Sequence, residues 1–381
     1  MNPVTDDPAT ASTTTISGPL AIASCAAMAL SYVAILYAPT LLLRLPPPTS
    51  LDNFMMRRFA CAFVSSAASA ALTASIVGAG RFRDLASIFG VFGIRADHTW
   101  RALVFPLLLT SLVYSGSLAL EFWLVISGRR GLKSFGEWVY GMLHNVMAWR
   151  NYVVAPFTEE LVFRACMIPL LLCGGFNRYN IIFLSPVFFS LAHLNHFLEL
   201  YCQHKYPFRK ALLIVGLQLG YTVIFGWYAS FLFIQTGNIL SPVVAHIFCN
   251  IMGLPVVYSS GTKGLVTAVF VAGTVSFFWL LLPASSPDLY NDSLDNCFCW
   301  HGFVCHLLWS IPPPSIVSDR LDNLNESWSQ FQCSTPPVKD GVGVVGIGHG
   351  KLLPELLVQK LRLLPQPLVL LHYAAVLQVQ V

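Results

Sequence analysis

Long apolar runs, separated by short charged or proline-containing stretches, recur along the first three quarters of the chain. A membrane-spanning helix needs roughly 20 mainly apolar residues, and about eight runs fit that requirement. Hydrophobic residues make up 55% of the 381 residues, and Asp, Glu, Lys and Arg only 10%, whereas soluble domains carry roughly 25% charged residues. The sequence therefore predicts an all-α polytopic membrane protein of about eight transmembrane helices and excludes a soluble enzyme.

Charge excludes two further classes of protein. The net charge of +4 comes from 22 Lys and Arg against 18 Asp and Glu, spread along the chain without a long basic run, so we expect no nucleic-acid partner. High hydrophobicity and low net charge also exclude an intrinsically disordered chain. Basic residues occur in loops on both predicted sides of the membrane, and orientation therefore cannot be assigned from the positive-inside rule.

The apolar runs divide the chain into four parts. We expect an N-terminal tail (1–15), N-terminal transmembrane helices with an interfacial segment (16–151), a catalytic transmembrane core (152–283) and a poorly structured or variant C-terminal tail (284–381). Ile16–Leu43 is not a convincing signal peptide, because Asp6 and Asp7 precede it and no Lys or Arg does. Within 131–151, Trp and Tyr alternate with charged residues, which is typical of a helix at the membrane interface.

The ten cysteines imply no disulfide framework, because half of them lie in apolar runs where thiols behave as small hydrophobes. One dense group occurs in the predicted tail: Cys297, Cys299, His301, Cys305 and His306. Its spacing fits no common zinc template. A metal site and a juxtamembrane group of reduced thiols both remain open for it.

Ionisable side chains interrupt three of the runs in the predicted core. Charged groups at membrane depth are costly unless they are paired or face a hydrated cavity, so they mark candidate functional sites. Glu160 and Arg164 are four residues apart and can form an ion pair on one helix face, whereas Glu159 points about 100° away. Glu159 is thus a candidate general base. The alternative is one buried structural network of all three residues.

Two further motifs carry histidines. His193 and His196 lie on neighbouring faces of one predicted helix turn, where they could orient water, bind a metal or bond a carbonyl. His246 and Asn250 have i,i+4 spacing and could hold an oxyanion together, or simply join two helices. A carboxylate base, a histidine that orients water and paired oxyanion donors are the groups that amide hydrolysis requires. Together the motifs predict an intramembrane catalytic cavity.

The sequences around these motifs resemble a known family. APFTEELVFRACM (155–167), FFSLAHLNHF (188–197) and SPVVAHIFCNIMG (241–253) are similar to the three motifs of the type II CAAX prenyl endopeptidases, a family of intramembrane glutamate proteases. The resemblance covers about 16–283 and does not extend into the tail after about Cys297. It implies removal of the last three residues, aaX, from prenylated CaaX proteins.

The resemblance also implies roles for individual residues. Glu159 matches the catalytic glutamate, His193 the histidine that activates water with it, and His246 and Asn250 the oxyanion pair. The supporting positions are Glu160, Arg164 and His196. No cofactor is expected. The implied substrates are farnesylated or geranylgeranylated proteins such as small GTPases, reached through membrane lipid, and the implied location is the endoplasmic reticulum membrane with the site open to the cytosol.

Two alternatives remain open at this stage. A zinc endopeptidase would use His193, His196 or His246 with a glutamate, although the spacing is weaker evidence than H-E-x-x-H. A membrane scaffold or binding protein would use the same buried polar groups without hydrolysis.

Overall fold

The computed structural model describes residues 16–77, 85–129, 135–192, 197, 199–203, 205–262 and 264–290. These residues form helices joined by turns, and no strand occurs among them. The all-α prediction is therefore confirmed. The cysteine and histidine group at 297–306 lies outside the described residues, as does most of the predicted tail.

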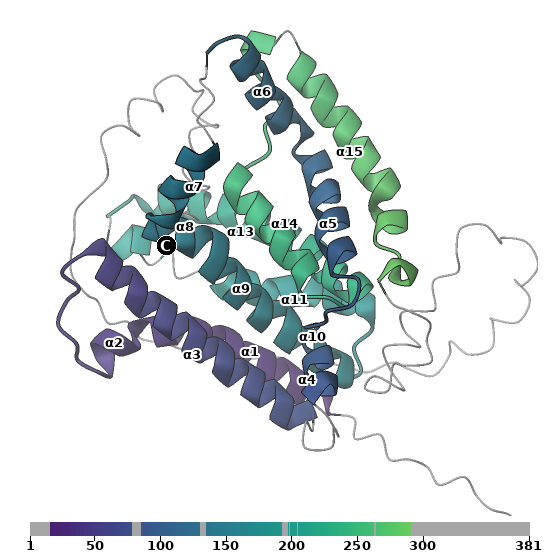
Figure 1. The fold of residues 1–381 in the computed structure, drawn as a ribbon. Coiled ribbons are helices and arrows are strands. Elements are labelled where there is room, and N and C mark those ends of the chain that lie inside the picture. The colour runs from purple at the N-terminus through teal and green to yellow at the C-terminus, as the bar shows by residue number, and fades with distance from the viewer. Residues whose placement is uncertain are drawn as a thin grey trace, which may run out of the picture.

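The first helices form one edge of the molecule (Figure 1). They are α1 (Gly18–Ala34), η1 (Ile35–Tyr37), α2 (Ala38–Leu41) and α3 (Leu51–Val77). The inner face of α3 buries small hydroxyl residues, namely Ser65, Ser66, Ser69 and Thr73. Small side chains allow close helix approach in membranes, and the Thr73 hydroxyl reaches the Cys166 carbonyl at 3.5 Å. This edge therefore packs directly on the helix that carries the glutamates.

That central helix is continuous but irregular. After α7 (Phe135–Leu143) come α8 (Val146–Trp149), the π-helix η3 (Arg150–Val154), α9 (Ala155–Glu160), the π-helix η4 (Leu161–Cys166) and α10 (Met167–Cys173). π-Helical segments are rare in proteins, and many of them lie at functional sites. Here two of them flank the single α-helical segment that carries both glutamates. The expected division between residues 151 and 152 falls inside this helix.

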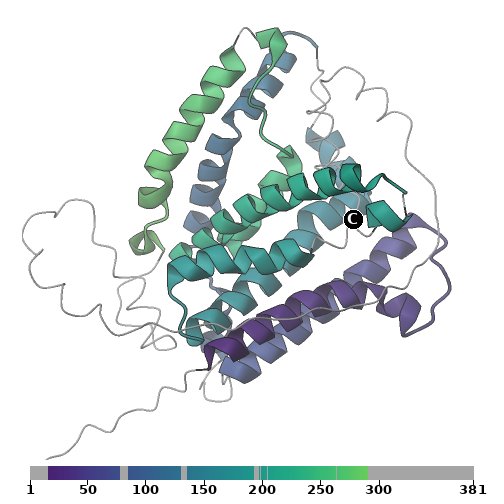
Figure 2. The ribbon, with the colours of Figure 1, turned by 180° about the vertical axis from the view of Figure 1, so that it is seen from behind.

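Helices from the second half cover the central helix on its other sides. They are α11 (Arg178–Ala192), the π-helix η5 (Glu199–Gln203), α13 (Phe208–Thr236) and α14 (Leu240–Met252). Figure 2 shows α11 and α13 crossing the middle of the molecule. They approach closely at Gly226, where an added Cβ would lie 2.6 Å from Pro186 Cβ. Gly237, with a positive φ of 60°, ends α13 and lets the chain turn into α14.

The opposite edge consists of α5 (Thr99–Val113), α6 (Ser115–Ile126) and α15 (Leu265–Ala284), with the short η6 (Ser260–Thr262) and η7 (Pro287–Leu289). The short α4 (Leu85–Val91) lies instead beside the ends of α1 and α3. The sequence predicts one run from Ala102 to Gly128, but the chain bends by 77° between α5 and α6. At the bend, the Tyr114 hydroxyl donates to the Gly253 carbonyl at 2.7 Å. The run is therefore not one straight helix, and this bond holds the bend against the end of α14.

Four helical stretches among the described residues are long and apolar enough to cross a membrane: Gly18–Leu41, Leu51–Val77, Phe208–Thr236 and Leu265–Ala284. The bent pair α5 and α6 would make a fifth. The chain is thus a multi-pass membrane protein. Most of the other predicted spans are short, bent or interrupted by charges, and they lie between the apolar helices.

A packing prediction follows from Gly273 on α15. An added Cβ there would overlap the Leu112 carbonyl of α5 and the Ser115 side chain, and such overpacking costs about 1 to 3 kcal/mol. We expect Gly273→Ala to lower the unfolding free energy in mixed micelles by that amount. Gly216→Ala on α13 is the control, because nothing lies within 4 Å of its Cβ position. Equal stability of the two variants would contradict the packing of α15 on α5.

Candidate active site

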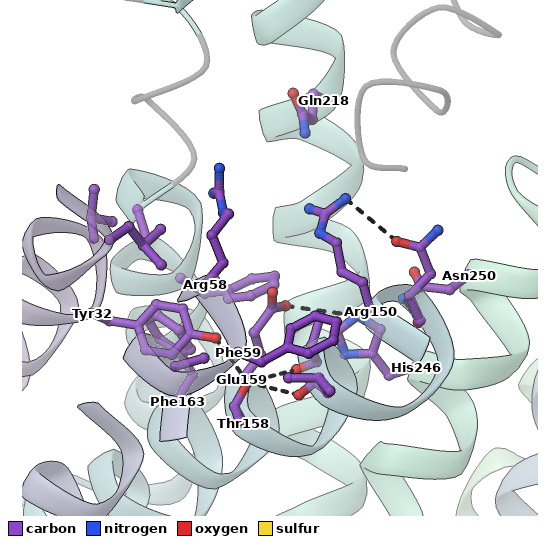
Figure 3. Close-up of a pocket in the computed structure, with 18 residues that line it drawn as sticks. Tyr32, Arg58, Phe59, Arg150, Thr158, Glu159, Phe163, Gln218, His246 and Asn250 are labelled. Carbon is purple, nitrogen blue, oxygen red and sulfur yellow. Dashed lines mark hydrogen bonds and ion pairs between the residues drawn. The ribbon is translucent and has the colours of Figure 1, made fainter. Parts of the chain in front are cut away.

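A cavity of about 120 Å³ opens beside the central helix (Figure 3). Its walls come from α1, η1, α3, η3, α9, η4, α11, α13 and α14. The polar residues that line it are Tyr32, Arg58, Arg150, Asn151, Thr158, Glu159, Gln218, His246 and Asn250. Segments far apart in the sequence therefore bring their polar side chains to one place.

The two adjacent glutamates occupy different environments. The Glu159 side chain is 19% exposed and lines the cavity. The Glu160 side chain is 0% exposed, as is that of Arg164. The ion pair that their spacing predicts is present, with Arg164 Nη1 3.1 Å from Glu160 Oε1. Only Glu159 of these three residues can thus meet a substrate or water in the cavity.

Glu160 also holds His246 of α14. The same oxygen, Oε1, lies 2.7 Å from His246 Nδ1. Because a carboxylate only accepts hydrogen bonds, the ring nitrogen donates. The Arg164 guanidinium lies over the Phe189 ring at 4.7 Å, and the Phe225 ring packs against His246 at 4.9 Å between ring centroids. The imidazole is therefore fixed by a buried charge pair and an aromatic wall.

This orientation directs the other ring nitrogen toward Glu159. His246 Nε2 lies 3.8 Å from Glu159 Oε2, which is too long for a direct hydrogen bond. A polar separation of this kind suits a bridging water or the reacting atoms of a substrate. Figure 3 shows Glu159 and His246 facing each other from different helices.

Asn250 is held by an irregularity of the backbone. In η3 the Ala155 N–H donates to the Arg150 carbonyl, the i→i+5 pattern. The next such donor would be residue 156, which is proline and has no N–H. The Asn151 carbonyl that is left over accepts from Asn250 Nδ2 at 2.8 Å. Asn250 therefore joins α14 to the central helix, which was the alternative role expected for it. Its second amide N–H remains for another acceptor.

The structure brings Glu159, His246 and Asn250 to one cavity, with Glu160 and Arg164 buried behind them. His193 and His196 lie outside the described residues. Ala192, the residue before His193, lines the cavity.

Several cavity residues were not predicted from the sequence: Tyr32, Arg58, Arg150, Asn151, Thr158 and Gln218. Gln218 is polar within an otherwise apolar run, a signal that could have marked it. Tyr32 bonds Thr158 across 2.9 Å, and its position in a uniformly apolar run carries no such signal.

Comparison with known proteins decides the family. A family model, type II CAAX prenyl endopeptidase Rce1-like, matches residues 142–252. CAAX prenyl protease 2 of Arabidopsis thaliana is 53% identical over 309 residues, which cover 77% of this chain and 98% of the relative. The chain belongs to the type II CAAX prenyl endopeptidase family. Human CAAX prenyl protease 2 is 33% identical, with 73% of this chain and 84% of the relative covered. No solved structure matches the chain.

Residues 142–252, which match the family model, include the whole cluster of Glu159, Glu160, Arg164, His246 and Asn250. The predicted family is therefore confirmed.

The buried ion pair behind the site gives a stability prediction. Removing one partner of a buried pair costs about 3 to 5 kcal/mol, because the other charge stays buried alone. We expect Arg164→Met to lower the unfolding free energy in mixed micelles by that amount, and Glu160→Gln added to it to restore part of the loss. Asp97→Asn is the control, since it breaks a partly exposed pair with Arg95 that is worth less than about 1 kcal/mol. Strictly additive losses in the double variant would contradict the pairing.

Proposed function

We propose that this endopeptidase hydrolyses the peptide bond after the prenylated cysteine of CaaX proteins with Glu159 as its general base. The observation that carries the proposal is the opposition of Glu159 Oε2 and His246 Nε2 across 3.8 Å of the cavity. The neighbouring Glu160 is engaged by Arg164 and His246. Glu159 is thus available for the chemistry, whereas Glu160 holds His246 in place.

In the proposed reaction, the Glu159 carboxylate takes a proton from a water molecule, together with His193 as the family resemblance implies. The hydroxide attacks the carbonyl carbon of the scissile bond, and the carbonyl oxygen becomes an oxyanion. His246 Nε2 and the second N–H of Asn250 donate to that oxyanion. Protonated Glu159 then gives its proton to the leaving nitrogen as the C–N bond breaks. Glu159 ends the cycle ionised.

Charge balance supports this assignment. Donation from both ring nitrogens requires the His246 imidazolium, whose charge the Glu159 carboxylate balances. With Arg164 and Glu160 forming a second neutral pair, the cluster has no net charge. Negative charge moves from Glu159 to the oxyanion during attack and stays next to His246. The reaction therefore avoids creating an uncompensated charge in a site of low dielectric constant.

The proposed substrates and the proposed membrane location rest on the family resemblance. We propose that the substrates are farnesylated or geranylgeranylated proteins such as small GTPases, which enter from the membrane lipid. Apolar residues of α1, η1 and α3, namely Val33, Leu36, Phe59 and Ala62, form one wall of the cavity and suit a lipid-modified chain. We further propose a location in the endoplasmic reticulum membrane with the site open to the cytosol.

Glu159→Gln tests the general base. We expect it to lower tripeptide release from a farnesylated CaaX peptide by about 10²- to 10⁴-fold, because the amide cannot accept the proton. Glu121→Gln on α6, outside the cavity, is the control and should cleave like the wild type. An active Glu159→Gln variant would contradict the proposal. Peptide binding without any product from the folded wild type would favour the binding-protein alternative.

A strong zinc chelator tests the metal alternative. No three His, Cys, Asp or Glu side chains of the described residues are placed to hold a metal ion together, but His193 and His196 are not among those residues. The glutamate mechanism predicts that cleavage survives prolonged chelation and dialysis. Loss of cleavage with the chelator, followed by its recovery on adding zinc, would replace this mechanism with the zinc one.

A further inference from the structure

One buried amide of the catalytic cavity takes no part in the proposed chemistry. Gln218 of α13 lines the cavity and is 2% exposed. Its Oε1 and Nε2 are buried, and neither has a hydrogen-bond partner among the described residues. Of the described residues that line the cavity, it alone has buried polar side-chain atoms without a partner. Figure 3 shows Gln218 apart from Glu159 and His246.

The next polar residue on the same face of α13 has the partner that Gln218 lacks. Thr222 is four residues further along the helix, and its hydroxyl shares a hydrogen bond with Ser190 Oγ of α11 at 3.2 Å. Buried polar groups are almost always bonded in this way, and each exception needs an explanation. A buried amide without partners costs free energy that a bound ligand can recover. Gln218 therefore points to a ligand group that both donates and accepts hydrogen bonds.

The substrate carries such groups. On the proposed function, on which this inference rests, the aaX segment has two more peptide groups beyond the scissile bond. An extended segment of three residues spans at most about 10 Å, so these groups bind in or near the same cavity. Each N–H and C=O needs a partner when it leaves water. A carboxamide can donate to the C=O and accept from the N–H of one residue.

The walls of the cavity suit this arrangement. The apolar wall comes from α1, η1 and α3, whereas Gln218 comes from α13, which covers another side of the central helix (Figure 2). A prenyl chain packed on the apolar wall leaves the α13 side of the cavity for the peptide.

We propose that Gln218 hydrogen-bonds the backbone of the aaX segment and so holds the scissile bond at Glu159. Recognition through the backbone does not depend on the side chains of the segment. It therefore fits an enzyme whose substrates end in different residues X.

Backbone-modified substrates test the proposal. Two farnesylated CaaX peptides each carry one ester in place of a peptide group, at the a–a bond in one and at the a–X bond in the other. Each loses one N–H, and the scissile bond is unchanged. The kcat/KM of each is compared with that of the all-amide peptide, using the full chain in proteoliposomes. We expect the wild type to cleave one ester peptide about fivefold to a hundredfold more slowly, because Gln218 Oε1 then lacks its donor.

Gln218→Met removes the amide at a similar side-chain volume. It should cleave the all-amide peptide at least as slowly as the wild type cleaves that ester peptide, and the ratio of amide to ester should fall to about one. Because the amide has no partner among the described residues to lose, the unfolding free energy in mixed micelles should stay the same or rise. A marked loss of stability would assign Gln218 a structural role and overturn the inference.

Gln235→Met is the matched control. Gln235 is also a buried glutamine of α13, and its Oε1 has no partner among the described residues, but it does not line the cavity. The variant should keep the wild-type ratio of amide to ester.

Two kinetic results would overturn the inference and leave the proposed function intact. One is a wild type that cleaves both ester peptides as fast as the all-amide peptide. The other is an ester effect that persists in Gln218→Met, because another group then binds that N–H. A wild type that cleaves none of the peptides would overturn the proposed function and this inference with it.

Discussion

One buried carboxylate oxygen organises this site. Glu160 Oε1 accepts from Arg164 Nη1 at 3.1 Å and from His246 Nδ1 at 2.7 Å, and it thereby joins α9 and η4 to α14. A buried carboxylate without such partners would cost several kcal/mol. Because Nδ1 is engaged, Nε2 must face the cavity and Glu159. The position of the proposed catalytic pair thus depends on a residue that does not line the cavity.

Two backbone irregularities hold α14 at further points. The proline at 156 interrupts the π-helical bonding of η3 and leaves the Asn151 carbonyl for Asn250. One turn further along, the Gly253 carbonyl accepts from Tyr114 at the bend between α5 and α6. Both irregularities look unfavourable when each helix is considered alone. Across helices, they supply the polar groups that hold α14 against the central helix on one side and against the bend between α5 and α6 on the other.

The sequence predicted the fold class and the residue types of the site for physical reasons. Apolar runs of membrane length and charges inside them are local properties, and so is the spacing that pairs Glu160 with Arg164. The contact of Glu160 with His246 joins residues 86 apart in sequence, and no periodicity encodes such a contact. The bend at Tyr114 was missed because its residues are as apolar as a straight span. Arg58 was missed because a charge at the start of a helix usually marks the membrane surface.

In the proposed mechanism, Glu159 and His246 enclose the reacting carbonyl without a metal ion between them. An experimental structure with a farnesylated phosphonate analogue of the tetrahedral intermediate tests it most directly. We expect one phosphonate oxygen within hydrogen-bond distance of His246 Nε2 and Asn250 Nδ2, and another oxygen beside Glu159. A metal ion bound between the histidines and the phosphonate, or a phosphonate remote from Glu159, would contradict it.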